Sequence, residues 1–275
     1  MKVILSRKGF DSVNGKMPSV IMPNGDMVSM PIPSPRDVNS YDQLWYGGKT
    51  YRQILKELAP KKRFPRCHLD PDIDSSRLVN KPCGWKPAFG QCSTSASYLL
   101  NTVDLSPNDI FLFFGNFRRV EEVDGQYRFV SRTGDFYRDS TIQVIWGYLQ
   151  VGEIIRDPRK VKADYPWHPH AFGGHLRDKT EMLVVPRKRL SFAPSRSGCG
   201  LLKYDVARVL TERGASKAFW KFNKVYSPDS IIVSKERKNN SSCPDCIYYS
   251  GYWQELGLKE SKASERWCKR MILGV

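Results

Sequence analysis

The sequence predicts an α+β fold in which a curled mixed or antiparallel β-sheet, a partial barrel, is flanked by helices in a single domain, residues 1–275. The continuous apolar run from Ile110 to Phe114 is typical of a central, buried strand. A longer apolar run extends from Ile142 to Ile155 and contains Gly147 and Gly152. Because glycines inside a strand indicate bends or bulges, we expect this sheet to curl.

Shorter segments predict the elements around these two strands. A buried strand is expected from Val3 to Leu5, and a hairpin is expected around the tight-turn dipeptide at residues 24–25. Helical spacing or small-residue packing predicts helices at residues 51–58, 92–103 and 261–272. Ser261 is a suitable N-cap of the last helix, and Trp267 and Met271 lie on one of its faces.

The charge balance indicates a polyanionic partner. The chain has 44 Lys and Arg residues against 28 Asp and Glu residues, a net charge of +16. A field of this sign attracts nucleic acid or anionic membrane. The sequence has no apolar run of about 20 residues and no apolar signal segment, so we expect a cytoplasmic protein that binds DNA and no membrane.

The cysteines are compatible with a reducing compartment, and they do not decide whether the chain binds a metal. There are seven of them, an odd number that favours free thiols. Cys243 and Cys246 form the only CxxC pair, whereas a structural zinc site usually needs two such pairs. Three histidines, His168, His170 and His175, lie close enough in sequence to hold a metal, or they are ordinary core or surface residues.

The segment from Ser6 to Asp11 combines groups suited to chemistry at the end of the first strand. Arg7 and Lys8 suit a phosphate, and Gly9 allows a turn or a close approach to a ligand. Asp11 could act as an acid, a base or a nucleophile. The alternative is an ordinary solvated turn.

Two further carboxylates flank a proline in the next candidate motif. Asp70 and Asp72 could share a metal or divide acid and base roles, or they could cap an Asp-rich turn. If extended, His168 and His170 would share one face and could converge on one ligand.

Two other segments could contact DNA. Asn116 and Arg118 follow the apolar run that begins at Ile110, again at a strand end. Around Trp220 and Lys221, cations alternate with aromatic residues, a combination that stacks on bases and holds the backbone. The same alternation also describes an edge element with a buried aromatic side.

Several motifs together resemble the third family of nucleotide-modification-associated domains. They lie in the same order as in that family, at residues 6–11, 30–33, 68–72, 113–118, 146–152 and 168–170. Towards the C-terminus the likeness is looser, around Gln254 and Glu265. The resemblance implies a role in DNA hypermodification and phage conflict: making, reading or removing modified bases.

The leading hypothesis is a DNA glycosylase that flips out a hypermodified base of double-stranded DNA, in antiviral defence, and cuts its N-glycosidic bond. Asp11 would be the catalytic carboxylate, with Asp70 and Asp72 as alternatives and His168 or His170 assisting the leaving group. The residues expected to contact DNA are Ser6, Arg7, Lys8, Asn116, Arg118, Gln150, Trp220, Lys221, Gln254 and Glu265.

This chemistry demands no metal and no organic cofactor, and we expect none. A non-catalytic reader of modified bases would use the same pocket and leave the bond intact. A base-modifying transferase is a third hypothesis, and it would need a donor cofactor. The sequence has no P-loop and no GxGxxG motif after a strand, which makes a transferase the weaker alternative.

Overall fold

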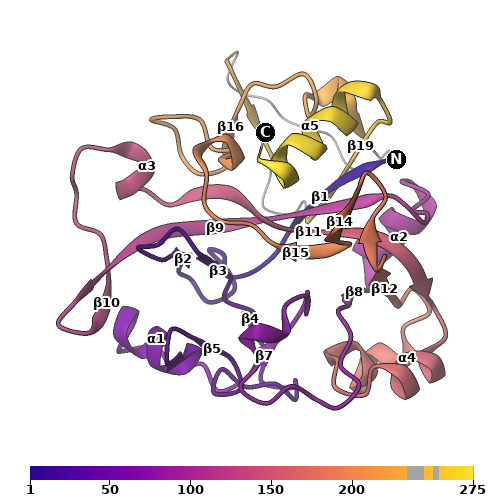
Figure 1. Cartoon of the computed structure of the whole chain (residues 1–275), viewed down its shortest axis with the longest axis horizontal. Helices are drawn as coiled ribbons and strands as arrows, with labels where there is room; N and C mark the ends of the chain where they lie inside the picture. Colours follow the sequence, from indigo (N-terminus) through magenta and orange to yellow (C-terminus); the bar gives the residue numbers. More distant parts are fainter. Residues whose placement is uncertain (234–244, 250–253, 275) are drawn as a thin grey trace.

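A large mixed sheet runs through the centre of the protein (Figure 1). The structure is a computed structural model that describes residues 1–233, 245–249 and 254–274. The main path of the sheet has the order β17-β19-β1-β9-β11-β12-β8. Its strands are β17 (Ile231–Ile232), β19 (Glu255–Leu258), β1 (Val3–Arg7), β9 (Ile110–Val123), β11 (Ile142–Ile155), β12 (Met182–Pro186) and β8 (Phe89–Gln91). Four more strands join it at the sides: β2 (Ser19–Ile21), β3 (Met27–Val28), β10 (Gln126–Phe129) and β15 (Cys199–Leu201).

Two strands from the start of the chain, β1 and β2, pair with the same edge of β9. β1 runs parallel to its first half, with Arg7 opposite Phe114, and β2 runs parallel to its second half, with Ser19 opposite Phe117. The chain at residues 8–18 therefore leaves the sheet and returns to the same edge. Because of this excursion, the predicted motif at residues 6–11 lies where β1 ends.

The predicted curl of the sheet is confirmed, and the two glycines of β11 lie where it bends. The register with β9 shifts between Ile145 and Gly147, and the register with β12 shifts between Val151 and Glu153. A Cβ on Gly152 would lie 2.9 Å from the backbone of Pro186. Bulges at these positions bend β11, so that its two halves belong to differently oriented parts of a half-barrel.

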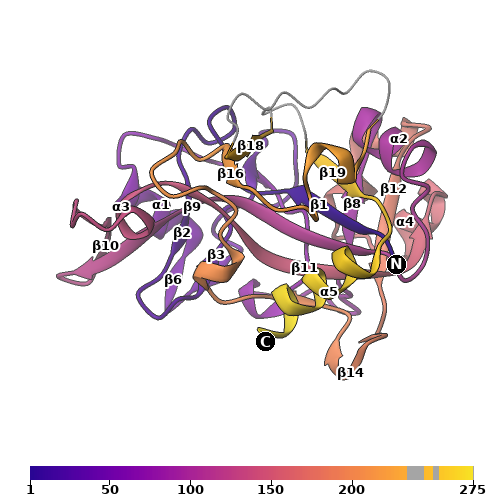
Figure 2. The ribbon, with the colours of Figure 1, turned by 90° about the horizontal axis from the view of Figure 1, so that it is seen from above.

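The helices gather around the ends of the long strands. Figure 2 shows α2 (Ser93–Asn101) and α4 (Pro158–Asp164) at one end, and α3 (Phe136–Asp139) with β10 at the other. α1 (Tyr51–Leu58) begins with a capping box formed by Thr50 and Gln53. α5 (Lys262–Leu273) begins after the predicted N-cap Ser261 and buries Trp267 and Met271, as its sequence pattern predicts. Among the described residues, no helix is long and apolar enough to cross a membrane.

Small paired strands and short 3-10 helices complete the fold. The pairs are β4 (Ile32–Pro33) with β7 (Cys67–His68), β5 (Trp45–Tyr46) with β6 (Lys49–Thr50), β13 (Arg189–Leu190) with β14 (Ala193–Ser197), and β16 (Phe219–Lys221) with β18 (Cys246–Tyr248). The 3-10 helices are η1 (Ser75–Arg77), η2 (Pro169–Ala171), η3 (Gly173–Arg177), η4 (Val206–Arg208) and η5 (Pro228–Ser230). In Figure 1, β16 and α5 lie on one side of the long strands, and α1, β5 and β7 lie on the other.

Two sequence predictions have a different outcome here. The segment at residues 168–170 is not extended, because His168 accepts a hydrogen bond from the backbone N–H of His170 and caps η2. Cys243 lies outside the described residues, so the CxxC pair stays a prediction, while Cys246 is buried on β18.

Candidate active site

A buried carboxylate, Glu255, is the centre of a polar group inside the curl of the sheet. Ser6 of β1 lies directly opposite Glu255 of β19 and donates a hydrogen bond of 2.9 Å to its Oε1. Gln91 of β8 donates to the same oxygen, and Lys8 Nζ lies 3.4 Å from it. Since β8 and β19 lie near opposite ends of the strand order, this contact shows that the curl brings the two ends together.

Lys8 connects Glu255 to a second carboxylate. Its ammonium lies 4.5 Å from the ring centroid of Phe89, and 11% of its side chain is exposed. Burial raises the pKa of Glu255, although Lys8 and the hydrogen bonds partly oppose this. Asp70, next to β7, interacts with the charge of the same ammonium. The charge of Lys8 therefore acts on two buried carboxylates.

Asp70 is fixed by its neighbours on two sides. Its Oδ1 accepts a hydrogen bond of 2.6 Å from the N–H of Gly90 and lies 3.5 Å from Nε2 of His168. Burial alone would raise the pKa of Asp70, but interactions with His168, His170 and Lys8 hold it below its ordinary range. Asp70 is thus a buried carboxylate whose charged form its neighbours stabilise, whereas burial raises the pKa of Glu255.

Three histidines form a cluster on the other side of Gly90. His68 Nε2 lies 3.2 Å from His170 Nε2, and the rings of His170 and His175 are 4.3 Å apart. The Nδ1 atom of each ring contacts a carboxylate. His68 Nδ1 lies 2.9 Å from Asp37. Glu181 contacts the other two: it lies 3.0 Å from His175 Nδ1 and also binds His170 Nδ1.

The pKa values of His170 and His175 are shifted in opposite directions. Hydrogen bonds with Cys92 and Glu181 raise the pKa of His175 to about 10. Burial lowers the pKa of His170 to about 4. A surface hollow of about 380 Å³ opens beside the cluster and is lined in part by Asp37, Cys92 and His175.

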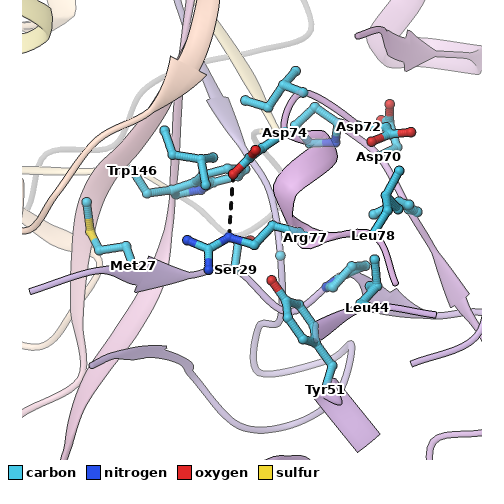
Figure 3. Close-up of a pocket in the computed structure, with 16 residues that line it drawn as sticks. Met27, Ser29, Leu44, Tyr51, Asp70, Asp72, Asp74, Arg77, Leu78 and Trp146 are labelled. Atoms are coloured by element: carbon cyan, nitrogen blue, oxygen red, sulfur yellow. Dashed lines mark ion pairs between the residues drawn. The ribbon is translucent and has the colours of Figure 1, made fainter. Parts of the chain in front are cut away.

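Asp72, another predicted site residue, lines a separate cavity together with Trp146 and Arg77 (Figure 3). Asp72 is buried there and accepts a hydrogen bond of 2.7 Å from the indole of Trp85. Burial raises the pKa of Asp72 to about 6. The cavity, between Trp146 and the Asp74–Arg77 ion pair, measures about 50 Å³. One water molecule needs about 10–15 Å³ of such space, so the cavity has room for a few water molecules.

A family model described as nucleotide modification associated domain 3 matches residues 2–262. The chain belongs to this family. The searches of curated proteins and of solved structures give no significant match. Membership associates this domain with modified nucleotides, and it is compatible with the nucleic-acid partner that the charge predicts.

Within this nucleotide modification associated domain, Asp11 lies outside the group around Glu255. Its Oδ1 accepts hydrogen bonds from the backbone N–H groups of Val13 and Asn14, and its Oδ2 lies 3.7 Å from Arg7. Asp11 therefore stabilises its own loop and orients Arg7. Arg7 also interacts with the charge of Glu255. These contacts assign Asp11 a local structural role and move the candidate catalytic carboxylates to Glu255 and Asp70.

Trp220 and Asn116 are core residues of the domain rather than DNA contacts. Trp220 is 1% exposed, packs against Phe114, and donates from its indole nitrogen to Gln143 Oε1 at 2.6 Å. Gln143 in turn donates to Asn116 Oδ1 at 3.1 Å. The predictions that Trp220 stacks on a base and that Asn116 reads a base edge are corrected, because this chain of hydrogen bonds is buried.

The side chain of Gln150 also lies in the protein interior. Its amide nitrogen donates to Ser191 and to the carbonyl of Asn108, and its Oε1 accepts from the N–H of Ser191. Both amide hydrogens and the amide oxygen are engaged by these partners, so the side chain anchors two loops. The prediction that Gln150 reads a base is corrected for this reason.

The remaining predicted DNA contacts lie at separate places. Gln254 adjoins the site, since its carbonyl accepts a hydrogen bond of 2.7 Å from the N–H of Arg7. Arg118 donates to the carbonyl of Val130, and Lys221 lies over the ring of Tyr137. Glu265 forms an ion pair with Lys269 on α5, four residues later, which places it on a helix surface.

Three residues of the candidate site were not predicted from the sequence as site residues: Glu255, Gln91 and Glu181. Glu255 directly follows Gln254, and Gln91 ends a motif of aromatic and small residues at 84–91. Glu255 and Gln91 contact each other only because strands that are distant in the sequence meet in the fold. A local signal exists for Glu181 alone, because it lies six residues after His175 and immediately before an apolar strand.

Proposed function

We propose that this domain hydrolyses the N-glycosidic bond of a modified nucleotide in DNA. The observation that supports this most is the pair of buried carboxylates around Lys8: Glu255 Oε1 lies 3.4 Å from its ammonium, and the charge of the same ammonium helps to lower the pKa of Asp70. Glycoside hydrolysis requires two carboxyl groups, one to protonate the leaving group and one to support the positive sugar and its water.

In this reaction the bond between C1′ of the deoxyribose and the base nitrogen breaks, and its electron pair leaves with the base. Glu255 supplies a proton to the departing base, a role that suits an acid whose pKa is raised by burial. Asp70 faces the cationic sugar and takes a proton from the attacking water, whose oxygen bonds to C1′. The products are the free base and an abasic site, so the protons balance.

Neighbouring residues position these two groups. Ser6 and Gln91 hold Oε1 of Glu255, and Gly90 holds Oδ1 of Asp70. Lys8 is the partly exposed member of this group and lies next to the loop that follows β1. The excess of 16 positive charges over the whole chain favours binding of the DNA backbone.

The test uses duplex DNA that carries hypermodified phage bases, with unmodified duplex of the same sequence as the control substrate. Released base is measured by mass spectrometry, and DNA affinity by fluorescence anisotropy. Wild-type protein should release base from modified DNA only, whereas Glu255→Gln should release at least a hundredfold less and keep its affinity. Glu153→Gln, which changes an exposed carboxylate of β11 that pairs with Lys160, is the matched control and should behave as wild type.

The same experiment separates the alternative functions. Base release by Glu255→Gln at the wild-type rate would exclude Glu255 as the acid. Tight binding of modified DNA with no chemical change would identify a reader. An altered base that stays in the DNA after addition of a donor would identify a transferase.

A further inference from the structure

We propose that His68, His170 and His175 bind a divalent transition-metal ion of the zinc class. They are three of the four histidines in the chain and come from three separate elements, β7, η2 and η3. One ring nitrogen of each lies within 4.8 Å of the others. This inference concerns metal binding alone and does not depend on the proposed hydrolysis.

The first argument is the tautomer that the carboxylates impose. An ionised carboxylate only accepts hydrogen bonds, so Asp37 and Glu181 place the ring protons on Nδ1 of His68 and of His170. Each neutral ring then carries a lone pair on Nε2. These two Nε2 atoms face each other at 3.2 Å, an arrangement that repels unless a proton or a metal ion lies between them.

The second argument is distance. Zinc binds imidazole nitrogen at about 2.0–2.1 Å with tetrahedral angles, so two such nitrogens lie about 3.3 Å apart. The observed separation of 3.2 Å between His68 Nε2 and His170 Nε2 agrees with that value. The two rings are therefore already spaced as ligands of one ion.

The third argument is the support behind the ligands. Metal-binding histidines usually donate their second ring nitrogen to a carboxylate, which fixes the ring and raises its basicity. Asp37 does this for His68, and Glu181 does it for both His170 and His175. The two carboxylates behind the rings also supply the negative charge that would balance a divalent ion.

The geometry leaves one coordination position towards the surface. Structural zinc sites are closed by four protein ligands, whereas catalytic sites keep a position for water or substrate. Here the hollow of about 380 Å³ reaches His175 and Cys92. Cys92 also forms a second possible ligand group with His175 and Glu181. We assign a site with three histidines, a solvent ligand facing the hollow, and Cys92 at its border.

The test measures metal in the full chain, purified without chelators. Elemental analysis should find about one equivalent of zinc per chain. After chelation, titration with Co²⁺ should produce visible absorption bands of a four- or five-coordinate ion, saturating at one equivalent. His68→Ala and His170→Ala should each reduce metal content at least tenfold. His168→Asn changes the fourth histidine, two residues from a ligand, and should keep the metal.

A milder variant keeps the proposal testable if the alanine variants do not fold. Asp37→Asn retains every ligand and alters only the support of His68, so Zn²⁺ affinity should fall about 10- to 100-fold with the circular dichroism spectrum unchanged. The proposal is overturned if wild-type protein contains no metal and shows no Co²⁺ bands. It is also overturned if folded His68→Ala keeps its metal, or if His168→Asn loses as much as His68→Ala.

Discussion

The imidazole of His170 lies against Gly90 so closely that a Cβ at Gly90 would come within 2.3 Å of the ring. The N–H of the same glycine donates to Asp70. One residue of β8 thus separates the carboxylate pair from the histidine cluster and contacts both. A shift of the backbone at Gly90 would therefore move both Asp70 and His170.

Gly90→Ala should consequently disturb both groups. The new methyl group would displace the His170 ring or shift β8, which we expect to cost about 1–3 kcal/mol of unfolding free energy. Metal content and base release should both fall. Gly174→Ala is the control, because a Cβ there would meet no described atom within 4 Å. Equal stability of the two variants in urea denaturation would contradict this tight packing.

The pH dependence of stability should report on Asp72. Its pKa in the folded state is about 6, above the ordinary value, so the folded protein binds this proton more tightly than the unfolded chain. Stability is then highest at or below about pH 4 for this group and declines as pH rises through about 6. The loss is at most about 3 kcal/mol.

Asp72→Asn keeps an acceptor for the indole of Trp85 but cannot ionise. Its unfolding free energy should therefore change less between pH 4 and 7 than that of wild type. Denaturation curves at several pH values measure this difference. Identical pH profiles would show that Asp72 does not ionise with a raised pKa.

The sequence predicted the sheet well because its signals are local. Continuous apolar runs identify β9 and β11, and Gly147 and Gly152 indicate where β11 bends. The end of β1 was also predictable as a place where polar side chains gather, since Ser6 and Lys8 closely follow an apolar run. These features need only neighbours along the chain.

The site was less predictable because its partners meet only after folding. Ser6 and Glu255 are 249 positions apart, and His68 and His170 are 102 positions apart. A single glutamate near the C-terminus has no pattern that distinguishes it from a surface residue. Trp220 shows the opposite problem: alternating cations and aromatics describe both a stacking surface and a strand with one buried side.

Substitution of Trp220 distinguishes these two descriptions. Because its side chain is buried among aromatic residues and bonds to Gln143, Trp220→Ala should cost about 3–5 kcal/mol of stability. Phe222→Ala, two residues later, removes a ring that is 56% exposed and should leave stability almost unchanged. Chemical denaturation compares the two. A stable Trp220→Ala protein with weakened DNA binding would instead restore the stacking hypothesis.

The ion pair between Lys8 and Glu255 gives the sharpest stability prediction. Lys8→Met removes an ammonium that lies 3.4 Å from a fully buried carboxylate and that opposes the rise of its pKa. The pKa of Glu255 should rise further, so ionising it in the folded state costs more. The variant should therefore lose up to about 3–5 kcal/mol at pH 8, and the loss should become smaller as the pH falls and Glu255 takes up its proton.

The double variant Lys8→Met/Glu255→Gln tests that explanation directly. With no carboxylate to ionise, it should recover most of the stability that Lys8→Met loses at pH 8, and its stability should depend less on pH. The cycle of wild type, two single variants and the double variant isolates the interaction energy. If the double variant is as unstable at pH 8 as Lys8→Met, the loss comes from packing over Phe89 and not from Glu255.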